Sequence, residues 1–408
     1  GGYSMKFIFA NNYYYLRGGS ERVFFDEMEM LEKDRHEVIP FARVFEKNFQ
    51  SKYSNFFAPP IEYEDVSLPR KISAAIKLMY SFDSKHCFLK LLENFKPDII
   101  HAHNIYGRLT TSILDVAYTK KIPVVMTLHD YKLICPSYLM LANNKVCESC
   151  EGKKFYYSVI KRCHKDSFLP SMVYFMESFI NRVFKKYIRA VKYFICPSKF
   201  SLSKHTKYGI PEEKLVYIPN FINADDFNPN YNSGEYIVFV GRLSKEKGVL
   251  TLLKAVKGLN IPVKIVGEGS MRAEYEGYVK ENKISNVIFD GYKSGDDLKN
   301  LFRNATFMVV PSEWYENAPM TILESFAYGK PVIGSDIGGI PEMVRHGETG
   351  LLFEMGNAQD LKAKIKEMLQ SPSRITEMGQ KARKIVEEEY NAELHYQRLK
   401  EVYEMACS

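Results

Sequence analysis

The sequence predicts an α/β protein with two doubly wound domains, and three observations lead to this fold class. Short apolar segments rich in Val, Ile and Phe alternate with helical segments along the 408-residue chain, which is typical of parallel sheets covered by helices. The length suits two domains. A polar stretch rich in Pro and Asn, residues 218–230, interrupts the alternation near the middle, and a second strand–helix series follows it.

The predicted strands lack a strict alternation of apolar and polar residues, so we expect both of their faces to be buried. Those of the first series are residues 6–10, 37–41, 98–102, 123–128 and 193–196, and those of the second are 236–240, 263–266, 286–290, 306–310 and 331–334. Helices are expected between them, for example at 21–31, 248–255, 296–302 and 361–369. We therefore place one domain at residues 5–218 and another at 219–391, and expect a last helix, 392–408, to pack back on the first domain.

The composition is that of a soluble globular protein, with 46% hydrophobic and 26% charged residues. A net charge of +7 suits phosphate-bearing ligands or an anionic membrane, and no motif supports nucleic-acid binding. No apolar run approaches the roughly 18 residues of a transmembrane helix. Seven cysteines without a secretory signal indicate a reducing compartment. We therefore expect a cytoplasmic protein.

Two carboxylates, Glu316 and Glu324, frame a predicted helix start that follows the strand at 306–310. Backbone amides at a helix start can face an anion, and Pro319 suits a first helical turn because it has no amide to satisfy. The amides in question are those of Asn317, Ala318 and Met320. Glu324 lies about two turns deeper, so the two acids can reach different parts of one ligand. Two solvated helix acids would explain the pattern equally well.

Two cations, Arg242 and Lys247, follow the strand at 236–240 together with Gly241. They therefore lie at the carboxyl edge of a parallel sheet, where open α/β folds bind ligands. Two fixed cations there suit a diphosphate and would stabilise the charge that develops as it leaves. The chain lacks the Asp-x-Asp pattern that holds a divalent metal in another transferase fold, and these cations could replace that metal. A charged surface turn is the alternative interpretation.

The first predicted domain contributes a glycine pair and three histidines. Gly18 and Gly19 lie between the first strand and the first helix, where they permit a phosphate to approach the backbone closely, although an ordinary tight turn explains them equally well. His129 ends the strand at 123–128 and could hydrogen-bond a sugar hydroxyl or transfer a proton. We expect His101 and His103 to open onto the same edge of the sheet.

Taken together, these motifs resemble the family 4 retaining glycosyltransferases of the GT-B fold. In chain order, the points of agreement are Gly18-Gly19 with Glu21, residues 97–103, 128–131 and 218–220, Gly241-Arg242 with residues 246–248, Pro311-Ser312, the pair Glu316 and Glu324, and residues 338–342. The resemblance implies two Rossmann-like domains that face each other across a cleft. One departure concerns residues 317–319, which read Asn-Ala-Pro where many members have a Gly-rich turn, and this leaves the donor sugar open.

The resemblance also implies a role for each matched residue. Arg242 and Lys247 would bind the donor diphosphate, and Glu324 would hold the ribose hydroxyls. Glu316 and the amides after it would hold the transferred sugar. The remaining roles are the Gly19 amide on the phosphate, His129 on the donor sugar, and the base near residues 291–293, which include Tyr292.

The implied function is a retaining transferase that moves a sugar from a UDP- or GDP-sugar to a glycan or polyprenyl-linked acceptor in cell-surface polysaccharide biosynthesis, with no cofactor needed for the chemistry. A nucleotide-sugar epimerase and a non-catalytic nucleotide-sugar-binding protein on the same fold are the alternatives. Only a transferase would release nucleoside diphosphate faster when an acceptor is present.

Four cysteines have the spacing C-x11-C-x2-C-x12-C: Cys135, Cys147, Cys150 and Cys163. Such a set is a plausible tetrahedral thiolate site for structural zinc, and buried free cysteines are the alternative. The segment, about residues 131–165, looks like a Cys-rich insertion that some family 4 enzymes carry after the His-Asp-Tyr motif. A metal there would brace the loop next to His129.

A strongly basic stretch covers residues 153–207, where 13 Lys or Arg residues face two acids, Asp166 and Glu177. Aromatic residues accompany it, and residues 70–80 form a second basic, aromatic-tipped stretch. Basic residues beside aromatics suit an anionic membrane surface. The hypothesis is peripheral contact with the inner face of the plasma membrane, with a solvated helix face as the alternative.

Overall fold

The structure, a computed structural model, describes residues 4–61 and 68–408, with side chains described only from residue 73 onwards after the gap. The basic residues Arg70 and Lys71 therefore lie outside the described side chains. The chain divides into two compact units. Unit 1 comprises the described residues up to Asn143, then Cys147–Ile218 and Tyr396–Ser408, and unit 2 comprises Asn144–Val146 and Pro219–His395.

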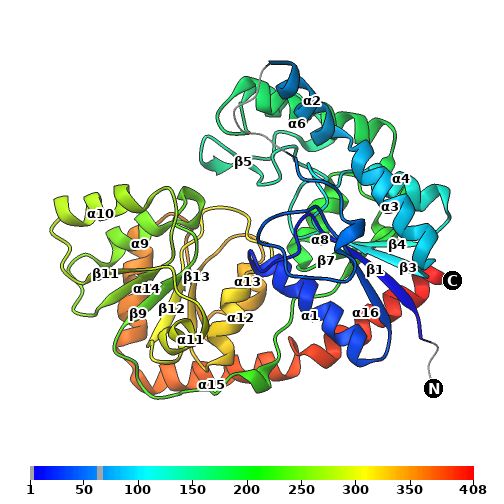
Figure 1. Cartoon of the computed structure of the whole chain (residues 1–408). Coiled ribbons are helices and arrows are strands. Elements are labelled where there is room, and N and C mark those ends of the chain that lie inside the picture. The colour runs from blue at the N-terminus through cyan, green and yellow to red at the C-terminus, as the bar shows by residue number, and fades with distance from the viewer. Residues whose placement is uncertain (1–3, 62–67) are drawn as a thin grey trace. The chain divides into compact units, whose positions relative to one another are not determined.

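Unit 1 is built on a six-stranded parallel sheet in the order β2-β1-β3-β4-β7-β8 (Figure 1). Its strands are β1 (Lys6–Ala10), β2 (Glu37–Phe41), β3 (Ile99–Ala102), β4 (Val124–Thr127), β7 (Val191–Cys196) and β8 (Leu215–Tyr217). Every strand expected in the first series overlaps one of these. β8 was not expected, because its three residues are too few to carry a pattern of their own.

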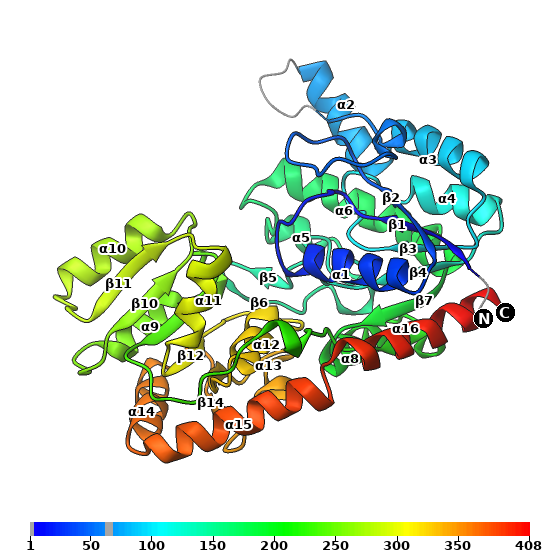
Figure 2. The same ribbon diagram turned by 60° about the horizontal axis from the view of Figure 1, so that its bottom comes forward.

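The helices of unit 1 are α1 (Gly19–Lys33), α2 (Leu68–Met79), α3 (Phe82–Phe95), α4 (Ser112–Thr119), α5 (Tyr157–Ile160), α6 (Phe168–Val183), α7 (Lys186–Ala190) and α8 (Lys199–Lys207). The last helix of the chain, α16 (Ala392–Cys407), runs along this unit (Figure 2). Helices α1 and α16 cover one face of the sheet, because Phe24, Leu31, Leu399 and Val402 share a buried cluster with Phe9 of β1. A two-stranded hairpin, β5 (Leu141–Ala142) with β6 (Lys145–Val146), precedes α5.

Unit 2 repeats the pattern with a second six-stranded parallel sheet, in the order β11-β10-β9-β12-β13-β14. Its strands are β9 (Ile237–Val240), β10 (Val263–Val266), β11 (Val287–Gly291), β12 (Phe307–Val310), β13 (Val332–Ser335) and β14 (Gly350–Phe353). All the strands expected in the second series are present. β14, at the edge of the sheet, was not expected.

The helices of unit 2 are α9 (Val249–Val256), α10 (Arg272–Glu281), α11 (Gly295–Arg303), α12 (Met320–Ala327), α13 (Ile340–Met343), α14 (Ala358–Leu369) and α15 (Pro372–Glu388). Short 3₁₀ turns occur in both units: η1 (Ser54–Phe56), η2 (Glu151–Lys153), η3 (Glu212–Lys214), η4 (Ala224–Asp226) and η5 (Lys245–Lys247). Helices α9 and α14 bury Leu252 and Ile365 against Ile265 and Phe307 of the sheet.

Both sheets reverse their strand order at one point, between β1 and β3 in unit 1 and between β9 and β12 in unit 2. In doubly wound sheets, ligands bind beyond the carboxyl ends of the strands at such a point. The loops after β1, β9 and β12 carry Gly18, Lys247 and Glu316, whereas His129 follows β4 and Tyr292 follows β11. The doubly wound α/β fold class is therefore confirmed, with two six-stranded parallel sheets.

None of the described helices is both long and apolar enough to cross a membrane.

Candidate active site

Two loops of unit 2, one after β9 and one after β12, meet at the switch point, which is the point where the strand order of the sheet reverses. Gly248 follows η5 with φ of +70°, and a Cβ atom at this position would lie 1.8 Å from the Pro311 carbonyl oxygen. Only glycine tolerates both this backbone conformation and this approach. The Glu313 amide also donates a hydrogen bond to the Glu246 carbonyl (2.8 Å). The two loops are therefore held as one surface.

Lys247 and Glu316 form an ion pair on that surface, with 2.6 Å between the ammonium nitrogen and Oε1. The Ser312 hydroxyl donates to the same carboxylate oxygen (2.8 Å). Glu316 is only 6% exposed. Burial raises the pKa of this carboxyl group, but the charge and hydrogen bond of Lys247 and the Ser312 hydroxyl outweigh it and lower the pKa below its usual range. Glu316 is therefore ionised at neutral pH.

The backbone around Glu316 is fixed by the glycine pair that precedes α13. The Gly339 amide donates to the Glu316 carbonyl (2.7 Å). Gly338 has φ of +60°, and a Cβ atom there would lie 2.5 Å from the Glu316 carbonyl oxygen. These glycines, which contributed to the family resemblance, hold the segment that carries the carboxylate.

The segment after Glu316 leads into α12. Pro319 is the N-cap residue and the helix begins at Met320, one position later than the first-turn role that we expected for Pro319. Asn317 and Ala318 are partly exposed, and the Ala318 carbonyl accepts a hydrogen bond from the Asn220 side chain (3.0 Å). Glu324 is a partly exposed residue in the second turn of α12.

The other predicted residues of unit 2 lie nearer to solvent. The Arg242 side chain is 64% exposed, and its guanidinium lies 3.8 Å from the carboxylate of Glu246. Because the cation is largely solvated, this ion pair has little energetic value. Tyr292 follows β11 and is 74% exposed. The Gly241 amide donates to the Val266 carbonyl (3.0 Å). Lys247 and Glu316 are therefore brought into direct contact, whereas Arg242 contacts a neighbour in its own loop.

A third loop of this edge, after β10, was missed in the sequence. A Cβ atom on Gly267 would lie 1.8 Å from the Gly241 carbonyl oxygen, and one on Gly269 would lie 2.2 Å from the Leu243 carbonyl oxygen. The loops after β9 and β10 therefore touch backbone to backbone. The available signal was the Gly-Glu-Gly run, residues 267–269, that directly follows the strand predicted at 263–266.

The glycine pair of unit 1 lies at the start of α1, which begins at Gly19 with Gly18 as an extended N-cap residue. Both glycines are exposed. A Cβ atom on Gly18 would meet only a carboxylate oxygen of Glu21, at 3.7 Å. The packing of the chain therefore does not require glycine at position 18, and the exposed helix start remains accessible to a ligand.

His129 belongs to a chain of polar side chains that runs into the core of unit 1. Its Nε2 atom lies 2.9 Å from Nδ1 of His103, and Nε2 of His103 lies 3.4 Å from a carboxylate oxygen of Glu27 on α1. His103 and Glu27 are fully buried. Burial, followed by the neighbouring His103, lowers the pKa of His129 to about 3. His129 is therefore neutral at physiological pH.

The contacts from His129 to His103 and from His103 to Glu27 determine which nitrogen of His129 carries the proton. A neutral imidazole has one donor and one acceptor nitrogen. If Glu27 is ionised, Nε2–H of His103 faces the carboxylate and Nδ1 of His103 accepts a hydrogen bond from Nε2–H of His129. Nδ1 of His129 is then left as an acceptor, so this histidine can receive a hydrogen bond from a hydroxyl group.

Glu27 was missed in the sequence, although a signal was present. It occupies an apolar stripe of α1 together with Val23, Phe24, Met28 and Leu31, at helical spacing. An acid in such a stripe needs a buried partner. This residue pattern indicated that Glu27 has a polar partner inside the first domain, but it did not identify that partner.

The expectation that His101 opens onto the sheet edge was wrong. His101 lies within β3 and is fully buried. Its Nδ1 is 2.7 Å from the Tyr403 hydroxyl on α16 and its Nε2 is 2.8 Å from the Thr127 hydroxyl. Both ring nitrogens are thus occupied within the core. The reason is that His101 lies within β3, which α16 covers, whereas His103 follows the end of that strand and reaches His129.

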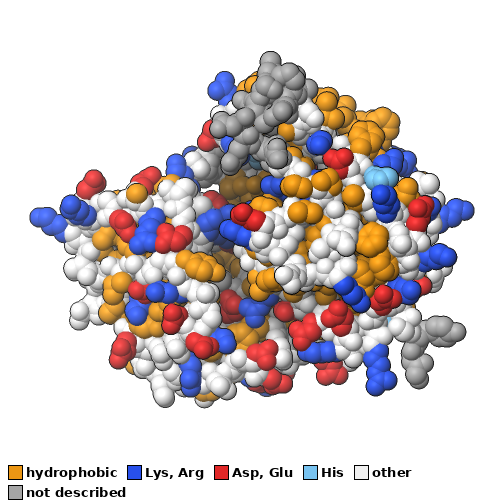
Figure 3. Space-filling view, viewed as in Figure 1, with side chains coloured by type: hydrophobic (Ala, Val, Ile, Leu, Met, Phe, Trp, Pro, Cys, Tyr) orange, Lys and Arg blue, Asp and Glu red, His pale blue; other side chains and the backbone are white. Residues whose placement is uncertain are grey.

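The surface of α6 in unit 1 carries exposed apolar side chains. They are Phe168, Leu169, Met176, Phe179 and Val183, each between 39% and 73% exposed. Figure 3 shows hydrophobic side chains gathered at the upper right of the face drawn there, over unit 1. Isolated apolar residues are normal on a surface, but a row of them along one helix indicates a contact surface.

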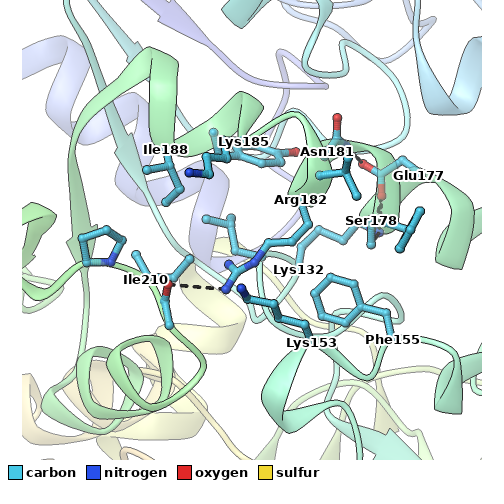
Figure 4. Close-up of a pocket in the computed structure, with 16 residues that line it drawn as sticks. Lys132, Lys153, Phe155, Glu177, Ser178, Asn181, Arg182, Lys185, Ile188 and Ile210 are labelled. Carbon is cyan, nitrogen blue, oxygen red and sulfur yellow. Dashed lines mark hydrogen bonds and ion pairs between the residues drawn. The ribbon is translucent and has the colours of Figure 1, made fainter.

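A pocket of about 470 Å³ lies beside α6 (Figure 4). Four basic residues line it, namely Lys132, Lys153, Arg182 and Lys185. Arg182 donates a hydrogen bond to the Tyr208 carbonyl (2.9 Å). Burial lowers the pKa of the Arg182 guanidinium. Lys132 and Glu177 also line the pocket and form a buried ion pair (2.7 Å).

Two doubly wound, six-stranded parallel sheets with loop sites at their carboxyl edges define the GT-B fold class. The Glycosyltransferase Family 4 model matches residues 17–226, more than half of the chain. The model described as Glycosyl transferases group 1 matches residues 221–385. The chain therefore belongs to glycosyltransferase family 4.

Curated relatives match parts of the chain. An uncharacterized glycosyltransferase of Methanocaldococcus jannaschii is 34% identical over 44% of this chain and 51% of its own length. The lipopolysaccharide 1,2-N-acetylglucosaminetransferase of Salmonella typhimurium is 30% identical over 51% of this chain and 60% of its own length. The chain thus spans about half to three fifths of the length of these relatives.

Solved structures match nearly the whole chain. Anabaena HepE in complex with UDP and glucose aligns with a TM-score of 0.69 and 16% identity, over 98% of this chain and 100% of that one. The sucrose-phosphate synthase of Thermosynechococcus elongatus aligns with a TM-score of 0.72 and 19% identity, over 98% of both chains. At these identities the likeness concerns the fold.

Proposed function

We propose that the protein is a retaining glycosyltransferase that moves a sugar from a UDP- or GDP-sugar to a glycan or polyprenyl-linked acceptor in cell-surface polysaccharide biosynthesis. The observation that carries this proposal is the Lys247–Glu316 pair (2.6 Å) at the switch point of unit 2, next to the start of α12. It places a cation and a buried carboxylate where doubly wound folds bind nucleotides.

The pair suits both halves of a nucleotide sugar. A bound diphosphate would draw the Lys247 ammonium towards its oxygens and stabilise the negative charge of the leaving group. The Glu316 carboxylate would then accept hydrogen bonds from the hydroxyls of the sugar. Glu324, deeper in α12, would hold the ribose, and Arg242 would close over the diphosphate from the exposed side of the loop. In this proposal these cations take the place of a metal ion.

Retention of configuration follows if the acceptor attacks from the face that the phosphate leaves. The bond between the sugar carbon and the phosphate oxygen breaks, and the acceptor oxygen forms its bond to the same carbon. The acceptor hydroxyl gives its proton to the departing phosphate. Neutral His129, with Nδ1 as an acceptor, would orient a hydroxyl of the donor sugar, and the amides at Gly18 and Gly19 would face a phosphate.

Two similar proteins support the proposed classes of donor and acceptor. The Salmonella relative is named for transfer of N-acetylglucosamine in lipopolysaccharide, and the HepE structure contains UDP and glucose. By extension, we propose a nucleoside diphosphate sugar as the donor of the present chain and a surface glycan as its acceptor.

The first test is the release of nucleoside diphosphate from a panel of UDP-, GDP- and ADP-sugars, with and without glycan acceptors. We expect one donor to be turned over, faster with acceptor, and Lys247→Ala and Glu316→Ala to lower turnover by about 100-fold or more. Lys254→Ala, which changes an exposed lysine of α9, is the matched control. Normal turnover in Lys247→Ala would overturn the assigned role, and release that no acceptor accelerates would favour an enzyme other than a transferase.

Peripheral membrane contact completes the proposal. The exposed apolar row of α6 lies beside the basic pocket residues Lys153, Arg182 and Lys185, a combination that suits an anionic lipid surface. Sedimentation with vesicles containing phosphatidylglycerol should deplete the protein from solution, and vesicles of phosphatidylcholine alone should not. Leu169→Ser with Phe179→Ser should weaken the binding, and equal binding to both vesicle types would contradict this part of the proposal.

A further inference from the structure

The pocket beside α6 combines an apolar lining with a surplus of positive charge. Its volume is about 470 Å³, and all the residues that line it belong to unit 1. Apolar side chains make up much of the wall, among them Leu133, Phe155, Phe179, Val183, Ile188 and Ile210. The charged side chains of the lining are four cations and one carboxylate. Such a pocket suits a ligand that is apolar in one part and anionic in another.

The single carboxylate of the lining, Glu177, is already compensated. The Lys132 ammonium lies 2.7 Å from its Oε2 atom, and the Asn181 amide donates to its Oε1 atom (2.7 Å). The same ammonium also donates to the Pro136 carbonyl (2.9 Å) and the Ser178 hydroxyl (3.1 Å). Because an ammonium has three donors, Lys132 is fully occupied by the protein. The charges of Lys132 and Glu177 therefore cancel, and the other three cations give the pocket its positive charge.

Arg182 is the most enclosed of these three cations. Its Nη2 atom donates to the carbonyls of Tyr208 (2.9 Å) and Gly209 (3.4 Å), so the guanidinium is held in place. Gly209 leaves room for it, since a Cβ atom there would lie 3.1 Å from Nη2. No carboxylate among the described residues forms an ion pair with Arg182. A guanidinium that is half-buried is stabilised by an anionic partner, and its Nε and Nη1 donors remain for one.

Lys153 and Lys185 supply further positive charge from exposed positions. Lys153 ends η2, and Lys185 lies between α6 and α7. Neither ammonium has a hydrogen bond or an ion pair within the described part of the chain. In Figure 4 the Lys153 and Arg182 side chains extend into the same part of the pocket. A phosphate has enough oxygens to accept hydrogen bonds from both of these groups.

The wall that carries Lys153 belongs to the segment of the four cysteines, residues 131–165. Two of these cysteines are buried, two are partly buried, and all are free thiols. Among the described residues, the only close group of potential metal ligands is Glu27, His101 and His103. The zinc site expected for the cysteines therefore stays a prediction, and the charge of the pocket does not depend on it.

The apolar row of α6 continues the apolar lining of the pocket onto the surface. Phe179 and Val183 belong to both, and Phe168, Leu169 and Met176 extend the row along the helix. A free phosphate would leave this surface uncovered, whereas a lipid phosphate would cover it with hydrocarbon. Two parts of the lining, Ile188 and residues 209–211, precede β7 and β8. They lie at the amino edge of the sheet, away from the carboxyl edge where an acceptor would react.

We propose that this pocket binds the phosphate headgroup of one anionic membrane phospholipid. The Arg182 guanidinium and the Lys153 ammonium bind the phosphate oxygens, and the acyl chains lie against the apolar row of α6. The inference rests on the membrane contact proposed above and gives it a defined ligand site, but it does not depend on the proposed catalysis.

Titration of the full chain with dihexanoyl-phosphatidylglycerol, below the concentration at which it forms micelles, tests the proposal by calorimetry. We expect saturable binding of one lipid per chain, and no saturable binding of dihexanoyl-phosphatidylcholine or inorganic phosphate. Lys153→Gln and Arg182→Gln should each weaken the binding by about 10-fold or more, because each removes a charge-assisted hydrogen bond. Lys154→Gln is the matched control, since Lys154 is exposed and adjacent but does not line the pocket. Its affinity should equal that of the parent protein.

Binding to vesicles, measured with the same variants, separates this site from a diffuse attraction of charges. If the chain binds phosphatidylglycerol vesicles, but Lys153→Gln and Lys154→Gln weaken that binding equally and the short-chain lipid does not saturate, the pocket proposal is overturned and the membrane contact stands. Failure to bind the vesicles at all would overturn both. Tighter binding of farnesyl phosphate than of the short-chain phosphatidylglycerol would assign the pocket to a polyprenyl-linked ligand and would also overturn the proposal.

Discussion

At the scale of single residues, each unit buries an acid next to its candidate residues. Glu316 is ionised because Lys247 and Ser312 compensate for its burial. Glu27 lies in the core of unit 1, where His103 separates it from His129. In unit 2 the buried acid fixes the position of the Lys247 ammonium. In unit 1 the buried acid, when ionised, selects the tautomer of His129 through His103.

The substitution Glu27→Gln tests the tautomer argument. A glutamine amide that donates to His103 reverses the chain of hydrogen bonds and places the proton of His129 on Nδ1. We expect kcat to fall by about 10-fold, which corresponds to roughly 1.4 kcal/mol for one misdirected hydrogen bond, with a smaller change in KM and an altered pH profile of kcat.

Glu29→Gln is the matched control, because Glu29 lies on the same helix but is exposed and paired with Lys33. Its kinetics should equal those of the parent protein. If Glu27→Gln lowers only the unfolding temperature and leaves kcat and its pH profile unchanged, Glu27 has a structural role and does not position His129.

At the scale of elements, glycines join the loops of unit 2. Gly248 lets η5 approach the end of β12, Gly267 lets the loop after β10 approach Gly241, and Gly338 supports the segment of Glu316. Each contact joins the ends of two different strands at the backbone level. The strands position the loops roughly, and these close approaches determine the distance between Lys247 and Glu316.

Two glycine substitutions separate the effect of backbone strain from the effect of the close contact between Gly248 and Pro311. Gly248 and Gly258 have similar φ angles, +70° and +78°, but a Cβ atom on Gly248 would strike the Pro311 carbonyl, whereas one on Gly258 would meet no atom within 4 Å. Gly258→Ala should lower the free energy of unfolding by about 1 kcal/mol, the cost of the backbone conformation. Gly248→Ala should lower it further and weaken nucleotide binding.

Chemical denaturation and equilibrium binding of UDP and GDP measure the two effects. Equal losses of stability in the two variants, with unchanged nucleotide affinity in Gly248→Ala, would show that the contact with Pro311 is not needed to hold the site.

At the scale of the whole molecule, buried titratable groups link stability to pH. Burial lowers the pKa of His129 to about 3 and that of His205 to about 4. The folded state therefore binds fewer protons than the unfolded state at these positions, where the ordinary pKa is about 6.5. Their contribution to stability is complete above that value and is lost as the pH falls towards 3 or 4. Burial raises the pKa of Asp130 to about 6, which acts in the opposite direction.

Burial also lowers the pKa of His164 to about 4. Because three histidines act against one aspartate, we expect the unfolding temperature to fall as the pH is lowered from 7 to 4. Calorimetry across this range measures the effect. The double variant His129→Gln with His205→Gln should lose less stability over the same range, whatever its stability at pH 7. A parallel decline in the variant would assign the acid sensitivity to other groups.

Much of the fold could be predicted from the sequence, because each central strand is a local run of apolar residues. The strands β8 and β14 could not, although the edge strands β2 and β11 were found. β8 has only three residues, and the Gly-Leu-Leu-Phe run of β14 contains none of the β-branched residues that favour strands. The motifs of the candidate site could also be found, since Gly241, Lys247 and Glu316 follow predicted strands. The sequence did not reveal which of these residues contact one another.

The amino-acid sequence by itself determined the fold class, the order of the elements and the loops that carry chemistry, because these depend on residues close together in the chain. Only the tertiary structure decided the partners. It paired Lys247 with Glu316 across 69 positions, buried His101 under Tyr403, and placed Glu27 behind His103. Such contacts depend on how distant segments pack, and burial then sets the charge of the groups that meet there.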